Sequence, residues 1–178
     1  MLRVIARPST GHVAAAAAVA AAGHATVRRD APAIYGALLV TALLAVQWRS
    51  DATAELVAAS ILVSVFVFWM THVWAEMVDL RVNGPLSRQR AAQIASAEAP
   101  MLTAAVPPIA TLALARVLGV RVEDAIALAL IVSIAQLFVW GLAIGRALDR
   151  GLGVALLIAA IECAFGLLLV GLKVVVVH

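Results

Sequence analysis

Three ionisable side chains share one helical stripe at the end of a long apolar run. His72, Glu76 and Asp79 stand at offsets of 0, +4 and +7 in the stretch FWMTHVWAEMVD. On a helix with 3.6 residues per turn these offsets fall on one face. An imidazole titrates near neutral pH and carboxylates attract cations, so the stripe could relay protons or collect cations. It equally fits a helix end at a membrane surface, where the acids face water and the neighbouring tryptophans form an aromatic belt.

A second candidate is Glu162, within the apolar run LLIAAIECAFGLLLVG. An acid at membrane depth costs about 2.5–3.5 kcal/mol on insertion scales, so it must face protein, be protonated or line water. Gln136 and Ser133 lie at a similar depth in the preceding apolar window. One window earlier, Pro107-Pro108 frees backbone carbonyls from the helix ladder. These groups predict one polar layer, which could be an ion pathway or a hydrogen-bonded clasp between Glu162 and Gln136.

The composition of the chain indicates that these residues belong to a membrane protein. The chain has 178 residues, of which 65% are hydrophobic and 13% charged, and its mean hydropathy is +1.07. A soluble domain has about 45–50% apolar and about 25% charged residues, so much of this surface must face lipid. The net charge of +3 comes without a basic stripe interleaved with aromatic residues. We therefore expect contact with the lipid bilayer and none with nucleic acid.

Five apolar windows approach the length of about 20 residues that crosses a bilayer. They cover residues 31–48, 53–80, 99–119, 123–144 and 151–177. The second is long enough to tilt or to protrude, and short connections make neighbouring helices antiparallel. The predicted fold is all-α, with a polytopic domain of five transmembrane helices over residues 31–178.

Residues 1–30 are expected to form an N-terminal cytoplasmic or interfacial segment. A cleaved signal peptide is the less favoured interpretation, because the apolar core is mostly alanine and Arg28 and Arg29 follow it.

Basic residues predict the orientation of the chain. With the N-terminus in the cytoplasm and the C-terminus outside, the inner segments hold Arg3, Arg7, Arg28, Arg29, Arg81, Arg88, Arg90, Arg146 and Arg150. Arg146 then lies level with the stripe and is the expected charge partner of Glu76 or Asp79. Near the outer side, Arg116 is expected to extend toward the membrane surface (snorkel) or to pair with Glu123 or Asp124. The expected location is a bacterial plasma (inner) membrane.

Sequence signatures of catalysis are absent from the chain. It contains no Gly-x-Ser-x-Gly, phosphate loop or dinucleotide fingerprint. His72 and Glu76 would supply two metal ligands, whereas a zinc site takes three or four, and the apolar windows hold no second histidine for haem. The prediction is a protein without enzymatic activity, metal or cofactor.

The combined prediction is an ion channel or ion-coupled transporter for protons or small cations. Glu162 would be its acid at mid-depth, and His72, Glu76 and Asp79 its inner vestibule. Because five helices leave little room for both a pore and a lipid-facing shell, we expect a homo-oligomer. The alternative is a non-transporting scaffold or an assembly subunit of a larger membrane complex. A continuous water-filled path along the polar groups would favour transport. Polar groups that are each hydrogen-bonded to one partner would favour the scaffold.

Overall fold

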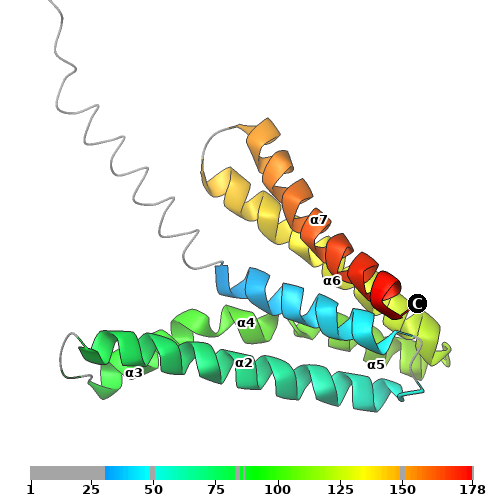
Figure 1. Cartoon of the computed structure of the whole chain (residues 1–178), viewed down its shortest axis with the longest axis horizontal. Helices are drawn as coiled ribbons and strands as arrows, with labels where there is room; N and C mark the ends of the chain where they lie inside the picture. Colours follow the sequence, from blue (N-terminus) through cyan, green and yellow to red (C-terminus); the bar gives the residue numbers. More distant parts are fainter. Residues whose placement is uncertain (1–30, 49–50, 83–84, 86, 149–150, 178) are drawn as a thin grey trace, which may run out of the picture.

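The computed structural model describes residues 31–48, 51–82, 85, 87–148 and 151–177, and these contain helices and turns but no strand. The helices are Ala31–Gln47, α2 (Ala54–Val82), α3 (Arg88–Glu98), α4 (Pro100–Thr103), α5 (Val106–Val117), α6 (Val122–Ala147) and α7 (Leu152–Val177) (Figure 1). The all-α prediction is confirmed for this part of the chain. The expected N-terminal segment over residues 1–30 lies outside the described residues.

Four helical segments are long and apolar enough to cross a membrane. They are Ala54–Val82, Arg88–Val117, Val122–Ala147 and Leu152–Lys173, and the second combines α3, α4 and α5. The Ala31–Gln47 helix is also apolar but falls short of the other four in length. Length and composition together indicate a multi-pass membrane protein.

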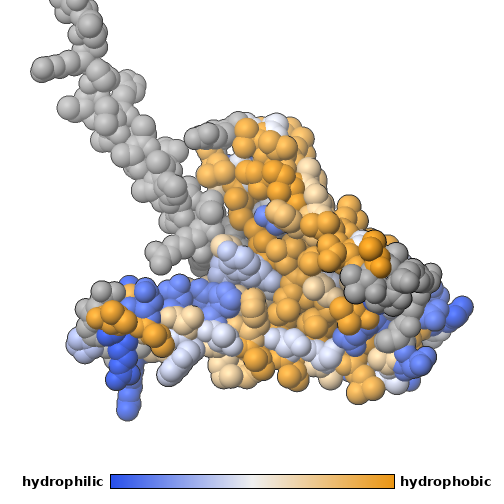
Figure 2. Space-filling view, in the orientation of Figure 1, coloured by the Kyte–Doolittle hydropathy of each residue, from blue (hydrophilic) through white to orange (hydrophobic). Residues whose placement is uncertain are grey.

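The α2–α3 end of the molecule is polar. The 29 residues of α2 extend about 43 Å at about 1.5 Å per residue, which exceeds the roughly 30 Å of bilayer hydrocarbon. The sequence predicted a connection over residues 81–98, but α3 occupies most of it, and the side chain of Ser87 caps α3 by accepting from the Arg90 amide. In Figure 2 hydrophilic residues gather over this end, whereas the α6–α7 side is hydrophobic.

The main core joins four helices. Val40 and Leu44 of the Ala31–Gln47 helix, Ile61 of α2, Leu112 of α5 and Ile126 of α6 are all buried there. The Ala31–Gln47 helix is therefore an integral part of the bundle, packed between α2, α5 and α6.

Two glycines let α6 and α7 approach closely. A Cβ built on Gly141 would lie 2.7 Å from the Cα of Ala159, and one built on Gly145 would overlap the Cα of Ala155. The two helices form a hairpin along one side of the molecule (Figure 1). Of the four candidate spans, α6 is the most buried, at 39% of its apolar window, and α7 the least, at 17%.

Candidate functional site

Glu162 lies inside the α6–α7 hairpin, about 15 Å along α7 from Leu152 at about 1.5 Å per residue. Its side chain is half-buried and passes beside Gly141, where an added Cβ would come within 3.0 Å of its Cγ. The carboxylate oxygen Oε2 is buried and has no hydrogen-bond partner among the described residues. An acceptor left in this state carries a desolvation cost of about 1–3 kcal/mol or more.

Gln136 faces the proline break on the other side of α6. Pro108 has no N–H to offer the carbonyl of Ala104, four residues earlier. The Gln136 amide Nε2 donates to that carbonyl at 3.2 Å, while its Oε1 is buried without a partner in the described chain. Two members of the predicted polar layer, Gln136 and a freed carbonyl, are therefore in contact. No hydrogen bond joins Gln136 to Glu162 among the described residues, so the clasp between them does not form within this chain.

Ser133 has a partner that sequence reasoning missed. Its hydroxyl lies 2.7 Å from the hydroxyl of Thr41, and Thr41 also donates to the carbonyl of Ala37 at 2.8 Å. Both side chains are fully buried. In the sequence, Thr41 is visible only as a lone hydroxyl in an apolar window. A threonine hydroxyl can bond a backbone carbonyl of its own helix, so the sequence does not predict a partner on another helix.

His72 sits among aromatic rings. Its ring centroid is 4.5 Å from that of Phe68 and 6.0 Å from that of Tyr35. The imidazole Nδ1 lies 3.3 Å from the Phe68 carbonyl of its own helix. Glu76 and Asp79 are both exposed farther along α2. The stripe thus passes from a half-buried imidazole to two surface carboxylates.

The predicted charge partners differ from those in the structure. Arg146 is exposed and forms no ion pair with a carboxylate of the described residues. It lies in the last turn of α6, and that end of the α6–α7 hairpin diverges from α2 (Figure 1). Arg116 pairs with Glu55 at 3.0 Å, so the expected pairing with Glu123 or Asp124, which lie in the first turn of α6, was wrong.

Two clefts of the described chain lie away from Glu162, Gln136 and Ser133. One, of about 250 Å³, lies between α2 and α5. The other, of about 330 Å³, is an open groove between α2 and the Ala31–Gln47 helix. Neither is lined by Glu162, Gln136 or Ser133. Within the part of the chain that the structure describes, no three potential metal ligands come together.

Comparison with known proteins adds nothing to this geometry. No family model, curated protein or solved structure matches the chain. Its function must therefore be inferred from the polar groups themselves.

Proposed function

We propose that the protein moves protons or small cations across the membrane, with Glu162 as the ion-binding side chain at mid-depth. The observation that carries this proposal is the buried Oε2 of Glu162, which lacks a partner in the described chain. By contrast, the buried hydroxyls of Thr41 and Ser133 bond to each other. A carboxylate in this position is stabilised when it takes up a proton or binds a cation.

Protons suit the site better than hard metal cations. A proton needs only one carboxylate oxygen, whereas calcium takes about six to eight oxygen ligands. Among the described residues, the buried side-chain atoms left without a partner are Glu162 Oε2 and Gln136 Oε1. Because Gly141 lacks a Cβ, the Glu162 side chain can pack directly against the α6 backbone.

The proposed protomer has five spans, with the N-terminus in the cytoplasm and the C-terminus outside a bacterial inner membrane. The Ala31–Gln47 helix would be the first span, with a length of about 25 Å at about 1.5 Å per residue. Because 17% of the α7 window is buried in one protomer, further copies could cover α7 and complete a pathway beside Glu162. In this homo-oligomer the exposed Glu76 and Asp79, with His72, would collect cations at the cytoplasmic mouth.

Flux from liposomes tests the proposal. Purified protein should dissipate a proton gradient, reported by an internal pH-sensitive dye, and Glu162→Gln should abolish that flux while the oligomer stays intact. The amide keeps the shape of the side chain but removes its ionisable proton. Alanine would also leave a cavity, so loss of the ionisable group could not be separated from loss of packing. The matched control is Glu123→Gln, because Glu123 is an exposed acid on α6 that pairs with Arg121. A Glu162→Gln protein that assembles normally and conducts at the parent rate would end the proposal.

A second candidate, a non-transporting scaffold or assembly subunit, is favoured by how the other polar groups are capped. Gln47 donates to Ser60, Cys163 to the Ile134 carbonyl and Lys173 to the Trp48 carbonyl. Capping of polar groups by other groups of the same chain is what helix association alone requires. Absence of protein-dependent flux under proton, potassium, sodium and chloride gradients, each tested separately, would select this candidate.

A further inference from the structure

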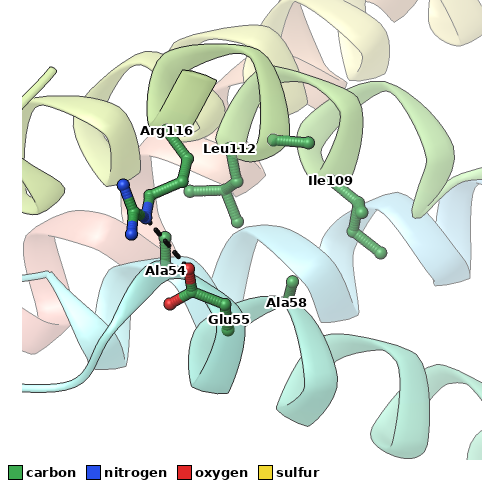
Figure 3. A pocket seen from close by; sticks show the side chains of 7 residues that line it. Ala54, Glu55, Ala58, Ile109, Leu112 and Arg116 are labelled. Carbon is green, nitrogen blue, oxygen red and sulfur yellow. Dashed lines mark hydrogen bonds and ion pairs between the residues drawn. The ribbon is translucent and has the colours of Figure 1, made fainter. Parts of the chain in front are cut away.

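The cleft between α2 and α5 combines an apolar wall with an ion pair at its mouth. Its wall is formed by Ala54, Ala58, Ile109, Leu112 and Ala113, and Glu55 and Arg116 complete the lining. In Figure 3 the two charged side chains reach toward each other from α2 and α5, with the apolar residues beside them. The volume of about 250 Å³ is enough for part of an alkyl chain.

The ion pair leaves donors available. Arg116 donates through Nε to Glu55 Oε1 at 3.0 Å, and its terminal amino groups make no hydrogen bond to a described residue. Both side chains are 64% exposed, and exposed pairs of this kind contribute about 0–1 kcal/mol to stability. Such a pair can open toward a ligand at little cost to the fold.

The position of each charge suits a membrane interface. Glu55 is in the first turn of α2 and Arg116 in the last turn of α5, so each charge is stabilised by the dipole of its own helix. Both therefore lie at the same end of two candidate spans, where lipid headgroups meet the protein. A ligand seated there meets a guanidinium, a carboxylate and an apolar slot together.

Chemical complementarity selects the headgroup. A guanidinium binds phosphate through paired N–H donors, and a carboxylate accepts hydrogen bonds from a primary ammonium. A choline headgroup has no N–H to donate to Glu55, and a glycerol headgroup brings no cation to it.

We propose that this cleft binds one phospholipid with an ethanolamine headgroup, whose phosphate contacts Arg116, whose ammonium contacts Glu55 and one of whose acyl chains enters the apolar slot. This site is independent of ion transport and of which face of the membrane it occupies.

Native mass spectrometry of the delipidated full chain, titrated with phosphatidylethanolamine, phosphatidylcholine or phosphatidylglycerol, tests the proposal. We expect the ethanolamine lipid to bind about tenfold more tightly than either of the others, because it alone forms the charge-assisted hydrogen bond to Glu55; a tenfold change corresponds to about 1.4 kcal/mol. Glu55→Gln should abolish the preference, whereas Arg116→Gln should weaken binding of all three lipids, because each carries the phosphate that Arg116 contacts. Ala113→Leu, which fills the slot without touching the charges, should weaken binding of all three lipids.

The exposed ion pair Arg121–Glu123 supplies the control, because it does not line the cleft. Arg121→Gln should keep the tenfold preference. The ratio between lipids is measured within each variant, so a general loss of stability cannot imitate the result. Equal binding of the three lipids, a preference that survives Glu55→Gln, or equally tight binding of soluble phosphoethanolamine without acyl chains would each overturn the proposal.

Discussion

Replacement of Gly145 by alanine should push α6 away from α7. The new Cβ would overlap the Cα and Cβ of Ala155, whereas carbon atoms attract each other best at about 3.5–4.0 Å. Since the obstacle includes backbone, no rotation of a side chain can relieve the clash. The helices themselves must separate.

The size of the effect follows from two opposing terms. Overpacking costs about 1–3 kcal/mol, and a backbone obstacle places Gly145→Ala near the upper limit. Alanine regains about 1 kcal/mol in helix propensity. The net loss in the free energy of unfolding should therefore be about 2 kcal/mol. In α7, Gly153 and Gly171 have no heavy atom within 4 Å of an added Cβ, so their alanine variants should be neutral or stabilised by up to about 1 kcal/mol.

Reversible unfolding by dodecyl sulfate in mixed micelles, followed by circular dichroism, measures these differences. Gly145→Ala should unfold at a lower mole fraction of dodecyl sulfate than the parent protein, and Gly153→Ala should not. Gly141→Ala, which meets the Cα of Ala159 at 2.7 Å, should fall between them. If Gly145→Ala and Gly153→Ala unfold together, the close approach of α6 and α7 is refuted.

Three further outcomes are expected. Gln136→Leu should cost about 1 kcal/mol of stability, but much less in a Pro108→Ala background, because the restored N–H can then bond the freed carbonyl; equal costs in both backgrounds would contradict this. Thr41→Val should cost about 1–3 kcal/mol, because the buried Ser133 hydroxyl then keeps only a long 3.4 Å contact with the Ala37 carbonyl. Ser133→Ala should cost less, because Thr41 still donates to that carbonyl, and the double variant should cost less than the sum of the two, a difference measured by unfolding. A cysteine at Arg88 should be labelled by an impermeant maleimide only from the cytoplasmic side, and labelling only from outside would reverse the proposed orientation.

The sequence predicted best where covalent chemistry decides the outcome. Proline cannot donate a hydrogen bond, so a freed carbonyl near Pro107-Pro108 was expected, and Gln136 caps one. Similarly, the length of the second apolar window predicted a helix longer than the bilayer, and α2 ends at Val82. Both inferences need only local geometry and the thickness of the membrane.

The α3 helix was not predicted, because its sequence is too polar to stand out in a search for apolar windows. Its sequence, RQRAAQIASAE, lacks the apolar content by which membrane helices are recognised. It is nevertheless rich in alanine, arginine, glutamine and glutamate, which favour helix, and Ser87 supplies the N-cap. The α3 helix then packs beside α2, and the indole Nε1 of Trp69 donates to the Ala95 carbonyl at 3.3 Å.

Charge partners could not be read from the sequence, because they depend on which helices are neighbours. Proximity along the chain favoured Glu123 or Asp124 for Arg116, but α5 lies along α2 and brings Glu55 closer. Depth along parallel axes likewise favoured Arg146 beside the acids of α2, whereas the α6–α7 hairpin diverges from α2 at that end. Contacts between helices distant in sequence require the three-dimensional arrangement.

At the interruption between α4 and α5, the backbone of one helical segment depends on a side chain of another helix. The segment from Arg88 to Val117 is helical on either side of residues 104–105, and the free carbonyl at this position is held by one side chain of α6 rather than by its own helix. The hydrogen bond from Gln136 therefore couples α6 to the position where α4 ends and α5 begins, so the packing of α6 helps to fix the direction in which α5 leaves that position.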